Sequence, residues 1–446
     1  MLAANLVSPP ALTPVAPGAA AKVAVVAIEM GYGHLRPARS LGRELKVEIL
    51  HTDRPPLADA EEQRRWQSTR RLYESMSRVS GIPWLGPPLR GVLNSITDIP
   101  NLYPFRDLSG ATLGVKLLER AARQGLGRSI VGYLREHDLA LLTTFYSPAV
   151  LADFHGYDRI FCVVTDSDVN RVWAPPAPAK SEIVYFAPSD RARRRMLSYG
   201  VSPAKVRLTG YPLPHELVGG RERTILKQNL ARRLARLRIS GNLYKLAESE
   251  LGPLPEADGP PLIVFAVGGA GAQVPLARAL IRGMKPQIEQ GKLRLALVAG
   301  RRAEVADALR QALRGASLQA IFPGDTPKSQ NAVELLEDPD VFSYFRRLNE
   351  LLARADVLWS KPSEMTFFAG LGLPFISAPP VGVHEAWNLR WANDRGAALP
   401  QHEPATAGEW LMEWLEDGVL AGAALSGHLR MPQLGLYEIC DQVLAS

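Results

Sequence analysis

The chain has 446 residues, of which 46% are hydrophobic and 22% charged, with a formal net charge of +7. This composition is typical of a globular protein with room for two domains, and it excludes a disordered or fibrous chain. The basic residues are interspersed with acidic ones and no basic run alternates with aromatics, so a nucleic-acid partner is not expected. The charge fits either an ordinary mixed surface or attraction to an anionic membrane or substrate.

The cysteine pattern and the N-terminus indicate the cellular compartment. Cys162 and Cys440 stand far apart and outside any metal-ligand spacing, so neither a disulfide framework nor a zinc site is predicted. Residues 1–21 are rich in Ala and Pro without a basic start or an apolar core, which indicates a flexible leader rather than a signal peptide. No stretch of 18 apolar residues predicts a membrane span. We expect a cytoplasmic protein.

The first half of the chain alternates strand-like and helical patterns. The apolar run at 22–28 predicts a strand that ends in a glycine turn, with a helix beginning near Pro37. A mostly helical excursion at 55–136 follows, and such a long excursion within a domain is usually functional or a lid. Further strand-like runs lie at 139–143, 160–165, 182–186 and 205–209, with helical patterns at 148–154 and 189–199. This alternation predicts a parallel sheet in a domain at 22–215.

A second series of the same kind follows a linker predicted at 216–260, which ends in the Pro/Gly-rich stretch 252–261. The second domain is predicted at 261–420, and a C-terminal helix at 421–446 can return to the first domain. Predicted strands lie at 262–267, 293–298, 318–322 and 356–359, predicted helices begin at Gln273, Ala303 and Phe342, and a polar insertion is predicted at 325–339. The fold class is therefore α/β, with two Rossmann-like domains facing a central cleft.

The first glycine loop carries a candidate base. Gly31 and Gly33 let the backbone approach a ligand closely, and the helix that follows offers free N–H groups at its start. His34 then projects toward the cleft, where its pKa near neutrality suits it to take a proton from an acceptor hydroxyl. The same pattern also fits a tight turn whose histidine is a cap or packing group.

The second glycine loop, at 268–271, follows an apolar strand and leads to Pro275, where the first turn of a helix tolerates proline. Such a loop suits a diphosphate, although a plain strand-to-helix turn has the same pattern. Its sequence departs from GxGxxG and from the P-loop, which argues against a dinucleotide site and against a P-loop kinase or ATPase.

The stretch 355–388 holds the densest set of polar side chains at predicted strand ends. Lys361 can neutralise phosphate, Ser363 and Thr366 can donate at a helix start, and Glu364 can accept from ribose hydroxyls. Hydrogen bonds to a sugar are expected from Gly382, His384, Glu385 and Asn388. In the first half, Asp166 and Trp173 follow a strand, where they can contact an acceptor or can serve only as a turn cap and a packing group.

Four patches give the chain a family resemblance: GYGHLRPARSL at 31–41, VTDSDVNRVW at 164–173 continuing through 185–213, VGGAGAQ at 267–273, and ADVLWSKPSEMTFFAGLGLPFISAPPVGVHEAWN at 355–388. The chain resembles GT-B glycosyltransferases, nearest to the monogalactosyldiacylglycerol synthases and the N-acetylglucosaminyltransferase that makes peptidoglycan lipid II.

The resemblance implies that the second domain holds a nucleoside diphosphate sugar, with a UDP-sugar as the expected donor, and that the first holds the acceptor. It implies that no metal or other cofactor is required. We expect an inverting transfer, because a single displacement at the anomeric carbon inverts it. The helical excursion at 55–136 and the positive net charge favour a hydroxyl of a lipid or lipid-linked acceptor, with peripheral membrane association at the inner face. His34 matches the family's general base, and the segment after Phe322 would lie near the nucleotide base. The donor-side positions are Gly268, Gly269, Ala270, Gly271, Gln273, Phe322, Lys361, Ser363, Glu364, Thr366, Gly382, His384, Glu385 and Asn388, and the acceptor-side positions are Gly31, Gly33, Asp166 and Trp173.

The chain departs from this family after its Lys-Pro turn and in its first glycine loop, which has Tyr32 inside it and lacks the family's fuller glycine run. Ser363 and Glu364 stand where the family has two glycines, and Phe367 and Phe368 lie near its expected ribose-binding acid. Glu364 can take that role from a different turn, or the donor site is altered. Three alternatives therefore stay open: a nucleotide-sugar epimerase, a glycosyltransferase acting on a small natural product, and a catalytically degenerate GT-B binding protein.

Overall fold

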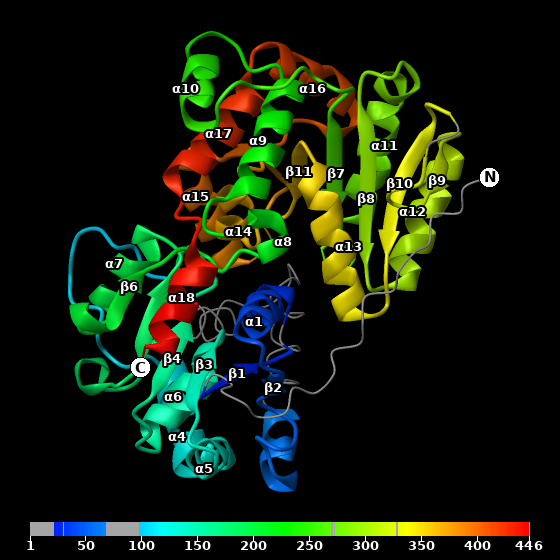
Figure 1. The fold of residues 1–446 in the computed structure, drawn as a ribbon. Helices are drawn as coiled ribbons and strands as arrows, with labels where there is room; N and C mark the ends of the chain where they lie inside the picture. The colour runs from blue at the N-terminus through cyan, green and yellow to red at the C-terminus, as the bar shows by residue number, and fades with distance from the viewer. Residues whose placement is uncertain are drawn as a thin grey trace.

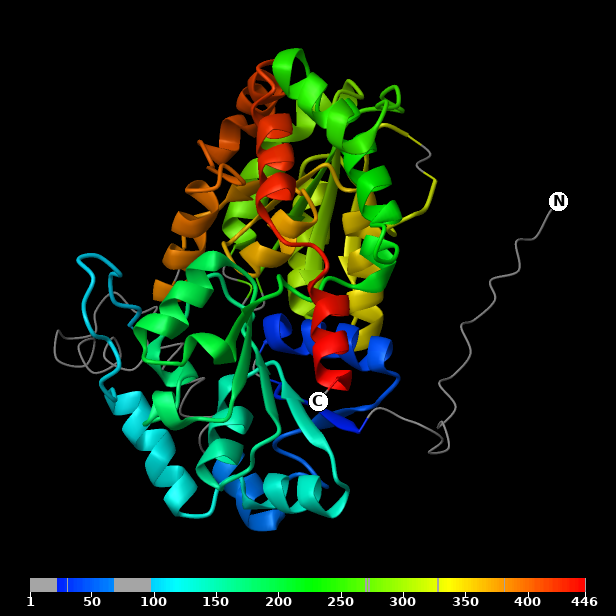
Figure 2. The ribbon, with the colours of Figure 1, turned by 60° about the vertical axis from the view of Figure 1, so that its left-hand side comes forward.

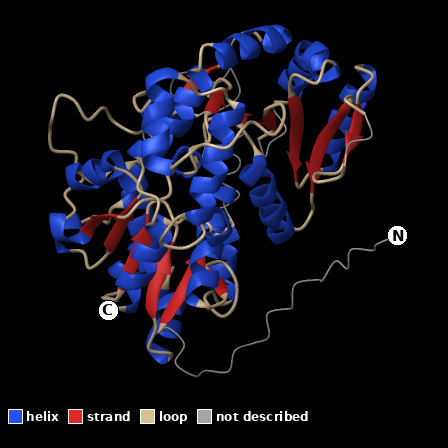
Figure 3. Cartoon of the chain, turned by 45° about the horizontal axis from the view of Figure 1, so that its top comes forward, coloured by secondary structure: helices blue, strands red, loops and turns tan. Residues whose placement is uncertain are grey.

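The computed structural model describes residues 22–29, 31–67, 98–268, 271, 273–326, 329–380 and 382–445. The predicted leader at 1–21 and the part of the excursion at 68–97 lie outside these residues. Figure 1 shows two α/β units, with the N-terminal unit below the C-terminal one, and Figure 3 shows helices on both sides of the strands. None of the described helices is long and apolar enough to cross a membrane.

The first unit is a six-stranded parallel sheet in the order β2-β1-β3-β4-β5-β6. Its strands are β1 Val23–Ala27, β2 Ile49–His51, β3 Ala140–Thr143, β4 Ile160–Val163, β5 Val184–Ala187 and β6 Val206–Leu208. Alternate residues of β1 point into different cores, Val23 and Val25 on one face and Ala24 and Val26 on the other. Because helices bury both faces of such a sheet, its strands are short continuous apolar runs, which made them visible in the sequence.

The second unit is a seven-stranded parallel sheet in the order β13-β12-β11-β7-β8-β10-β9. Its strands are β7 Leu262–Ala266, β8 Arg294–Gly300, β9 Gln319–Ile321, β10 Ala332–Glu337, β11 Val357–Ser360, β12 Phe375–Ser377 and β13 Ala398–Pro400. The fold class predicted from the sequence is confirmed.

The polar insertion predicted at 325–339 is wrong, because this stretch contains β10, which lies between β8 and β9. Its two glutamates hid the strand pattern. Glu334 forms an ion pair with Arg354 of a neighbouring helix, and Glu337 forms one with Arg310 of another. Charges that are paired in this way can be carried by a strand whose remaining side chains are apolar and largely buried.

The helices cover both sheets. Those of the first unit are α1 Tyr32–Leu45, α4 Leu113–Arg123, α5 Arg128–Glu136, α6 Tyr146–Phe154 and α7 Asp190–Ser198, with short 3-10 turns η1 Arg171–Trp173, η2 Pro178–Lys180 and η3 Pro203–Lys205. Those of the second unit are α11 Val274–Glu289, α12 Ala303–Gly315, α13 Val341–Arg354, α14 Met365–Gly370, α15 Val383–Asn393, η4 Pro404–Thr406, α16 Ala407–Glu416 and α17 Val419–Arg430. Within the predicted excursion, α4, α5 and residues 60–67 are helical, whereas 98–112 has no regular structure.

The segment predicted as a linker contains α8 His215–Val218, α9 Thr224–Arg236 and α10 Gly241–Leu251. Leu230 and Leu234 of α9 lie in the core of the second unit. The buried guanidinium of Arg233 donates to the backbone carbonyls of Ala355 and Leu371, at 2.9 and 2.8 Å. These contacts satisfy carbonyls at helix ends that would otherwise be unpaired, and they build α9 into the second unit.

The chain returns to the first unit at its end. Figure 2 shows the last helix, α18 Gly435–Leu444, lying over the lower unit while α17 stays with the upper one. α18 packs against α1. One apolar cluster contains residues of both units, from Val25 and Leu41 to Val264 and Phe345. The two units therefore share a continuous core in this arrangement.

Candidate functional site

Each sheet has one topological switch point, at which the chain begins to add strands on the other side of the first strand, and we call this point the reversal. In the first unit the reversal lies between β1 and β3, because β2 lies on one side of this pair and β4 to β6 on the other. In the second unit it lies between β7 and β11. Open parallel sheets bind ligands outside the carboxyl ends of their strands at such reversals. These two places are where a functional site is expected.

His34 lies at the reversal of the first sheet. Gly31 precedes α1 with a φ of 131°, a backbone conformation that essentially only glycine adopts, and it turns the chain so that His34 stands in the first turn of the helix. The His34 Nδ1 atom lies 3.0 Å from the carbonyl oxygen of Thr144, the residue that follows β3. The Thr144 hydroxyl donates back to the His34 carbonyl at 2.7 Å. These two bonds tie together the loops on either side of the reversal.

The contacts of His34 determine its tautomer. A carbonyl oxygen only accepts, so the neutral imidazole carries its proton on Nδ1 and leaves the Nε2 lone pair bare. Thr165 Oγ1 also lies 3.1 Å from Nδ1, whereas Nε2 has no hydrogen-bond partner among the described residues. Burial lowers the pKa of His34 below its ordinary value of 6.5, against the opposing effect of Asp166 and the hydrogen bond to Thr144. His34 is therefore a neutral base with its free nitrogen at Nε2.

Aromatic side chains surround the imidazole. The ring of Phe145 stands edge-on to His34 with 4.7 Å between centroids, and the ring of Trp173 lies 6.3 Å away. Tyr146 packs against both Phe145 and Trp173. This apolar wall explains why burial is the largest influence on the histidine pKa, and it places Trp173, predicted on the acceptor side, beside His34.

Gly268 and Lys361 meet at the reversal of the second sheet. Gly268 follows β7 and Lys361 follows β11, and the Ser360 hydroxyl joins the two strands by donating to the Ala266 carbonyl at 2.8 Å. A Cβ atom built on Gly268 would lie 2.8 Å from Cε of Lys361 and 2.9 Å from its Cδ. The lysine side chain therefore lies across the backbone of Gly268, and the absence of a side chain there makes room for it.

The polar groups of this second site are partly engaged. Lys361 Nζ donates to Glu385 Oε1 at 2.5 Å, which leaves an ammonium group with further N–H donors. The backbone N–H of Gly268 donates to the side chain of Gln273 at 3.2 Å, and that of Gly271 donates to the Gly268 carbonyl. A phosphate oxygen at Gly268 would take the place of the Gln273 carboxamide oxygen. The predicted positions Gly269 and Ala270 lie outside the described residues.

Glu364 has a backbone conformation that favours glycine. Its φ of 47° is in the left-handed region, which costs a residue with a side chain about 1–2 kcal/mol. Its carboxylate accepts from Arg36 Nε at 3.1 Å. Arg36 comes from α1 of the first unit, is 3% exposed, and also donates to Asn349 of α13 at 3.1 Å. The ion pair between Arg36 and Glu364 therefore links the two units and favours the strained conformation.

Two more predicted positions contact the first unit directly. The Thr366 hydroxyl donates to the Thr165 carbonyl at 3.2 Å. Asn388 Oδ1 accepts from the Ser167 hydroxyl at 2.5 Å and from its N–H at 3.2 Å, and Asn388 Nδ2 lies 3.3 Å from Asp166 Oδ1. Thr366 and Asn388 were predicted to contact the nucleotide-sugar donor, and the structure places both at the junction between the units.

Replacing Asn388 with alanine should therefore weaken the junction. Asn388 is 1% exposed, so the Ser167 groups would lose a buried acceptor, and we expect the free energy of unfolding to fall by about 2 kcal/mol. Urea denaturation followed by tryptophan fluorescence measures this change. Asn393→Ala is the control, because Asn393 is exposed at the end of the same helix. An effect of Asn388→Ala no larger than that of the control would contradict this role.

Other predicted positions lie next to Glu364, Glu385 or Lys361. Gly33 is close, since a Cβ atom there would lie 3.6 Å from Cγ of Glu364. His384 is exposed and folds back over Gly382, with 4.0 Å from its Nε2 to Glu385 Oε1. Ser363 donates its N–H to the Lys361 carbonyl.

Phe322 stands apart from the other donor-side positions. It follows β9, an edge strand that is separated from β7 by β8 and β10, and its exposed ring lies under Arg347 at 4.6 Å. The structure does not bring Phe322 together with Gly268 and Lys361.

Comparisons with known proteins add limited information. Residues 256–417, within the second unit, match a family described only as a domain of unknown function, DUF6938. No curated protein matches the sequence.

Solved structures cover most of the chain at low identity. MurG of Acinetobacter baumannii is 12% identical, with 94% of this chain and 99% of that one covered and a TM-score of 0.48. The glycosyltransferase SnogD of Streptomyces nogalater is 12% identical over 94% and 98%, with a TM-score of 0.46. The UDP-GlcNAc 2-epimerase of Neisseria meningitidis is 11% identical over 80% and 89%, with a TM-score of 0.43. Because these TM-scores are below 0.5, the fold of this chain is assigned from the strand order of its two sheets.

Two site residues escaped the sequence analysis. Thr144, which fixes the His34 tautomer, acts through its backbone carbonyl, and a carbonyl leaves no trace in a sequence. Arg36 did leave a signal, because a charged residue stands beside Leu35 and Pro37 in a helix whose apolar face continues through Leu41. An arginine at a position flanked by buried residues indicates a buried ion pair.

Proposed function

We propose that this protein is a glycosyltransferase that moves a sugar from a nucleoside diphosphate donor to an acceptor hydroxyl. One observation carries the proposal: a neutral histidine with a free Nε2 and a lysine lying across a glycine occupy the reversal points of two facing sheets. The contacts of Thr366 with Thr165 and of Asn388 with Asp166 join helices α14 and α15 of the second unit to the loop that follows β4 of the first. A base on one side and a cationic group suited to phosphate on the other are what such a transfer requires.

The proposed reaction is a single displacement. His34 Nε2 takes the proton of the acceptor hydroxyl while its oxygen attacks the anomeric carbon, and the bond from that carbon to the diphosphate oxygen breaks. The leaving nucleoside diphosphate takes the electron pair of that bond, and Lys361 stabilises the developing negative charge. Displacement from the opposite face inverts the configuration at the anomeric carbon. His384 and Glu385 are proposed to contact the donor sugar, and Glu364 the ribose. The transfer is proposed to need no metal.

We further propose a UDP-sugar as donor and a lipid or lipid-linked alcohol as acceptor. The choice of a lipid acceptor is supported by exposed apolar side chains in the excursion at 55–136, which precedes β3. These are Tyr103, Phe105, Leu113 and Leu117. The Phe105 side chain is 77% exposed, and exposed aromatic side chains with arginine and lysine nearby in the sequence suit the surface of an anionic membrane.

A thermal-shift series with the diphosphates and diphosphate sugars of uridine, guanosine and thymidine tests the donor site. A nucleotide that binds only the folded protein stabilises it by about 2.7 kcal/mol at 100 times its Kd, so the melting temperature should rise by a few degrees and keep rising with the logarithm of the nucleotide concentration. The best donor then enters a diphosphate-release assay with candidate acceptors. Failure of every nucleotide to raise the melting temperature would argue for a degenerate fold.

The same donor incubated alone and followed by nuclear magnetic resonance separates transfer from epimerisation. A transferase leaves the sugar of the donor unchanged until an acceptor is added, whereas an epimerase converts it without one. Conversion in the absence of an acceptor would overturn the transferase proposal.

A further inference from the structure

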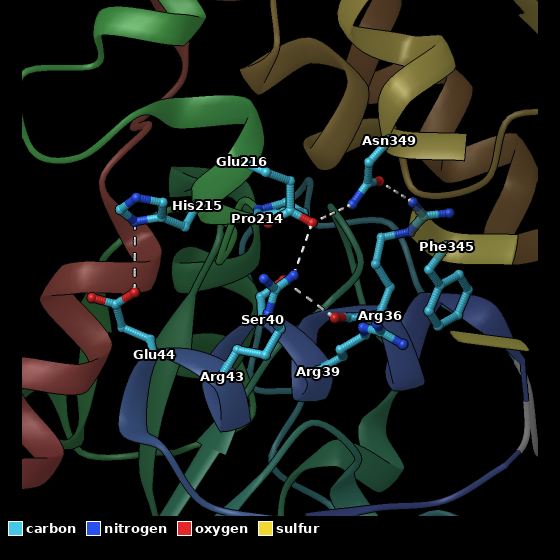
Figure 4. A pocket seen from close by; sticks show the side chains of 10 residues that line it. All are labelled: Arg36, Arg39, Ser40, Arg43, Glu44, Pro214, His215, Glu216, Phe345 and Asn349. Carbon is cyan, nitrogen blue, oxygen red and sulfur yellow. Dashed lines mark hydrogen bonds and ion pairs between the residues drawn. The ribbon is translucent and has the colours of Figure 1, made fainter. Parts of the chain in front are cut away.

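A pocket lies between the units, next to the site described above, with which it shares Arg36. It has a volume of about 250 Å³, and Figure 4 shows its walls: α1 below, the start of α8 to one side, and α13 above. It is lined by Arg36, Arg39, Ser40, Arg43, Glu44, Pro214, His215, Glu216, Phe345 and Asn349. The positions from α1 follow the spacing of one helix face, so its arginines are presented together.

Most charged groups of this pocket have partners. Arg43 Nη1 lies 3.3 Å from Glu216 Oε1, which also accepts from Asn349 at 3.0 Å. Arg36 is paired with Glu364, and Glu44 Oε2 lies 3.8 Å from His215 Nδ1. Of the two carboxylates in the lining, Glu216 is therefore engaged by Arg43 and Asn349, whereas Glu44 only faces His215, whose Nδ1 also lies 3.0 Å from the Tyr437 hydroxyl.

Arg39 differs from its neighbours. Its guanidinium stacks over the ring of Phe342 at 4.5 Å, and no dashed line reaches it in Figure 4. Among the described residues it has no carboxylate within ion-pair distance. Burial is the largest influence that lowers the pKa of Arg39, and the nearby positive charge of Arg43 lowers it further. An anion beside Arg39 would relieve both effects.

We propose that this pocket binds a small soluble oxyanion, carrying a phosphate or carboxylate group, held by Arg39 and Arg43. A guanidinium fork matches both kinds of group, and two arginines four residues apart on one helix can hold one anion between them. The pocket exceeds the size of an inorganic phosphate ion, so a phosphorylated or carboxylated metabolite fits, with Phe345 as an apolar wall.

The pocket is also connected to the donor side of the proposed active site. Its walls come from both units, so the oxyanion binds only while α1 and α13 are close together. Arg36 reaches from this pocket to Glu364, the proposed ribose contact. The oxyanion therefore stabilises the arrangement that brings the two reversal points together. The oxyanion is therefore an effector that is distinct from the donor and the acceptor. Its binding raises the affinity for the nucleotide donor, and donor binding raises the affinity for the oxyanion by the same factor.

Binding is tested on the full chain with inorganic phosphate and with citrate, against sodium chloride at equal ionic strength. For at least one of the two anions we expect a melting temperature that rises with the logarithm of the anion concentration, and a heat of binding that saturates. Arg39→Gln should weaken binding about tenfold or more, because it removes a charge-assisted hydrogen bond. Arg314→Gln, which removes an exposed arginine at the end of α12, should leave binding unchanged.

A second variant separates this pocket from the proposed diphosphate site, where phosphate could also bind. Lys361→Ala should leave anion binding intact, since Lys361 does not line the pocket. The proposal is overturned if neither anion binds, if Arg39→Gln binds as the wild type does, or if Lys361→Ala alone abolishes binding. None of these outcomes depends on whether a nucleotide binds, so the anion pocket and the transferase proposal can fail separately.

Discussion

Replacing His34 with alanine is expected to lower the rate of sugar transfer by about 100-fold or more, with little change in nucleotide affinity. A positioned general base contributes about 10²–10⁴-fold, and His34 is held for this role by the 3.0 Å contact of its Nδ1 with the Thr144 carbonyl. Steady-state kinetics with saturating donor measures the change in kcat, and titration with nucleoside diphosphate measures the affinity. His137→Ala is the control, because His137 is exposed at the end of α5.

The pH dependence gives a second measurement on the same residue. His34 acts only in its neutral form, and burial lowers its pKa below 6.5. It therefore stays neutral as the pH falls to 6.5, and kcat/KM should be lost only at lower pH, with a slope of one proton. The acid limb should disappear in the His34→Ala variant. A limb centred well above 6.5, or one that survives this substitution, would reject His34 as the base.

The parts of the fold that the sequence predicted are those in which a single residue pattern decides the structure. Strands buried on both faces, such as β1 and β7, appear as apolar runs that end in glycine turns, and both were found with nearly correct ends. β10 was missed because Glu334 and Glu337 interrupt its apolar pattern, and their partners Arg354 and Arg310 lie on helices elsewhere in the chain. A pairing between distant residues cannot be inferred from local composition.

The candidate site divides in the same way. Lys361 follows β11, Gly268 lies in the loop after β7, and His34 lies in the first turn of the helix after β1, so the rule that ligands lie at the carboxyl ends of parallel strands was enough to select them. The sequence could not show that Thr366 and Asn388 face the first unit, because the relative placement of two domains depends on contacts between remote segments. The ion pair between Arg36 and Glu364 joins residues 328 positions apart. It explains why a glutamate occupies a left-handed position that favours glycine.

Replacing Lys361 with alanine is expected to weaken the binding of nucleoside diphosphate by about 10- to 100-fold. A charge-assisted hydrogen bond is worth about 1.5–3 kcal/mol, and in the described part of the second sheet's reversal Lys361 is the cationic group that lies across Gly268. Isothermal titration with the best nucleotide of the thermal-shift series measures the loss. Lys285→Ala is the control, because Lys285 lies on α11, where it pairs with Glu289.

A substitution at Gly268 tests the same contact from the other side. Gly268 is not in the left-handed region, so alanine is compatible with its backbone, and the atoms nearest to its Cβ would be Cε and Cδ of the flexible Lys361 side chain, at 2.8 and 2.9 Å. Gly268→Ala should therefore displace the ammonium group while leaving the fold stable, and it should weaken nucleotide binding in the same direction as Lys361→Ala. Because both variants remove one contact, the double variant should bind about as weakly as Lys361→Ala alone. Effects that add in full would show that the two residues act at separate places, and the shared diphosphate site would then be rejected.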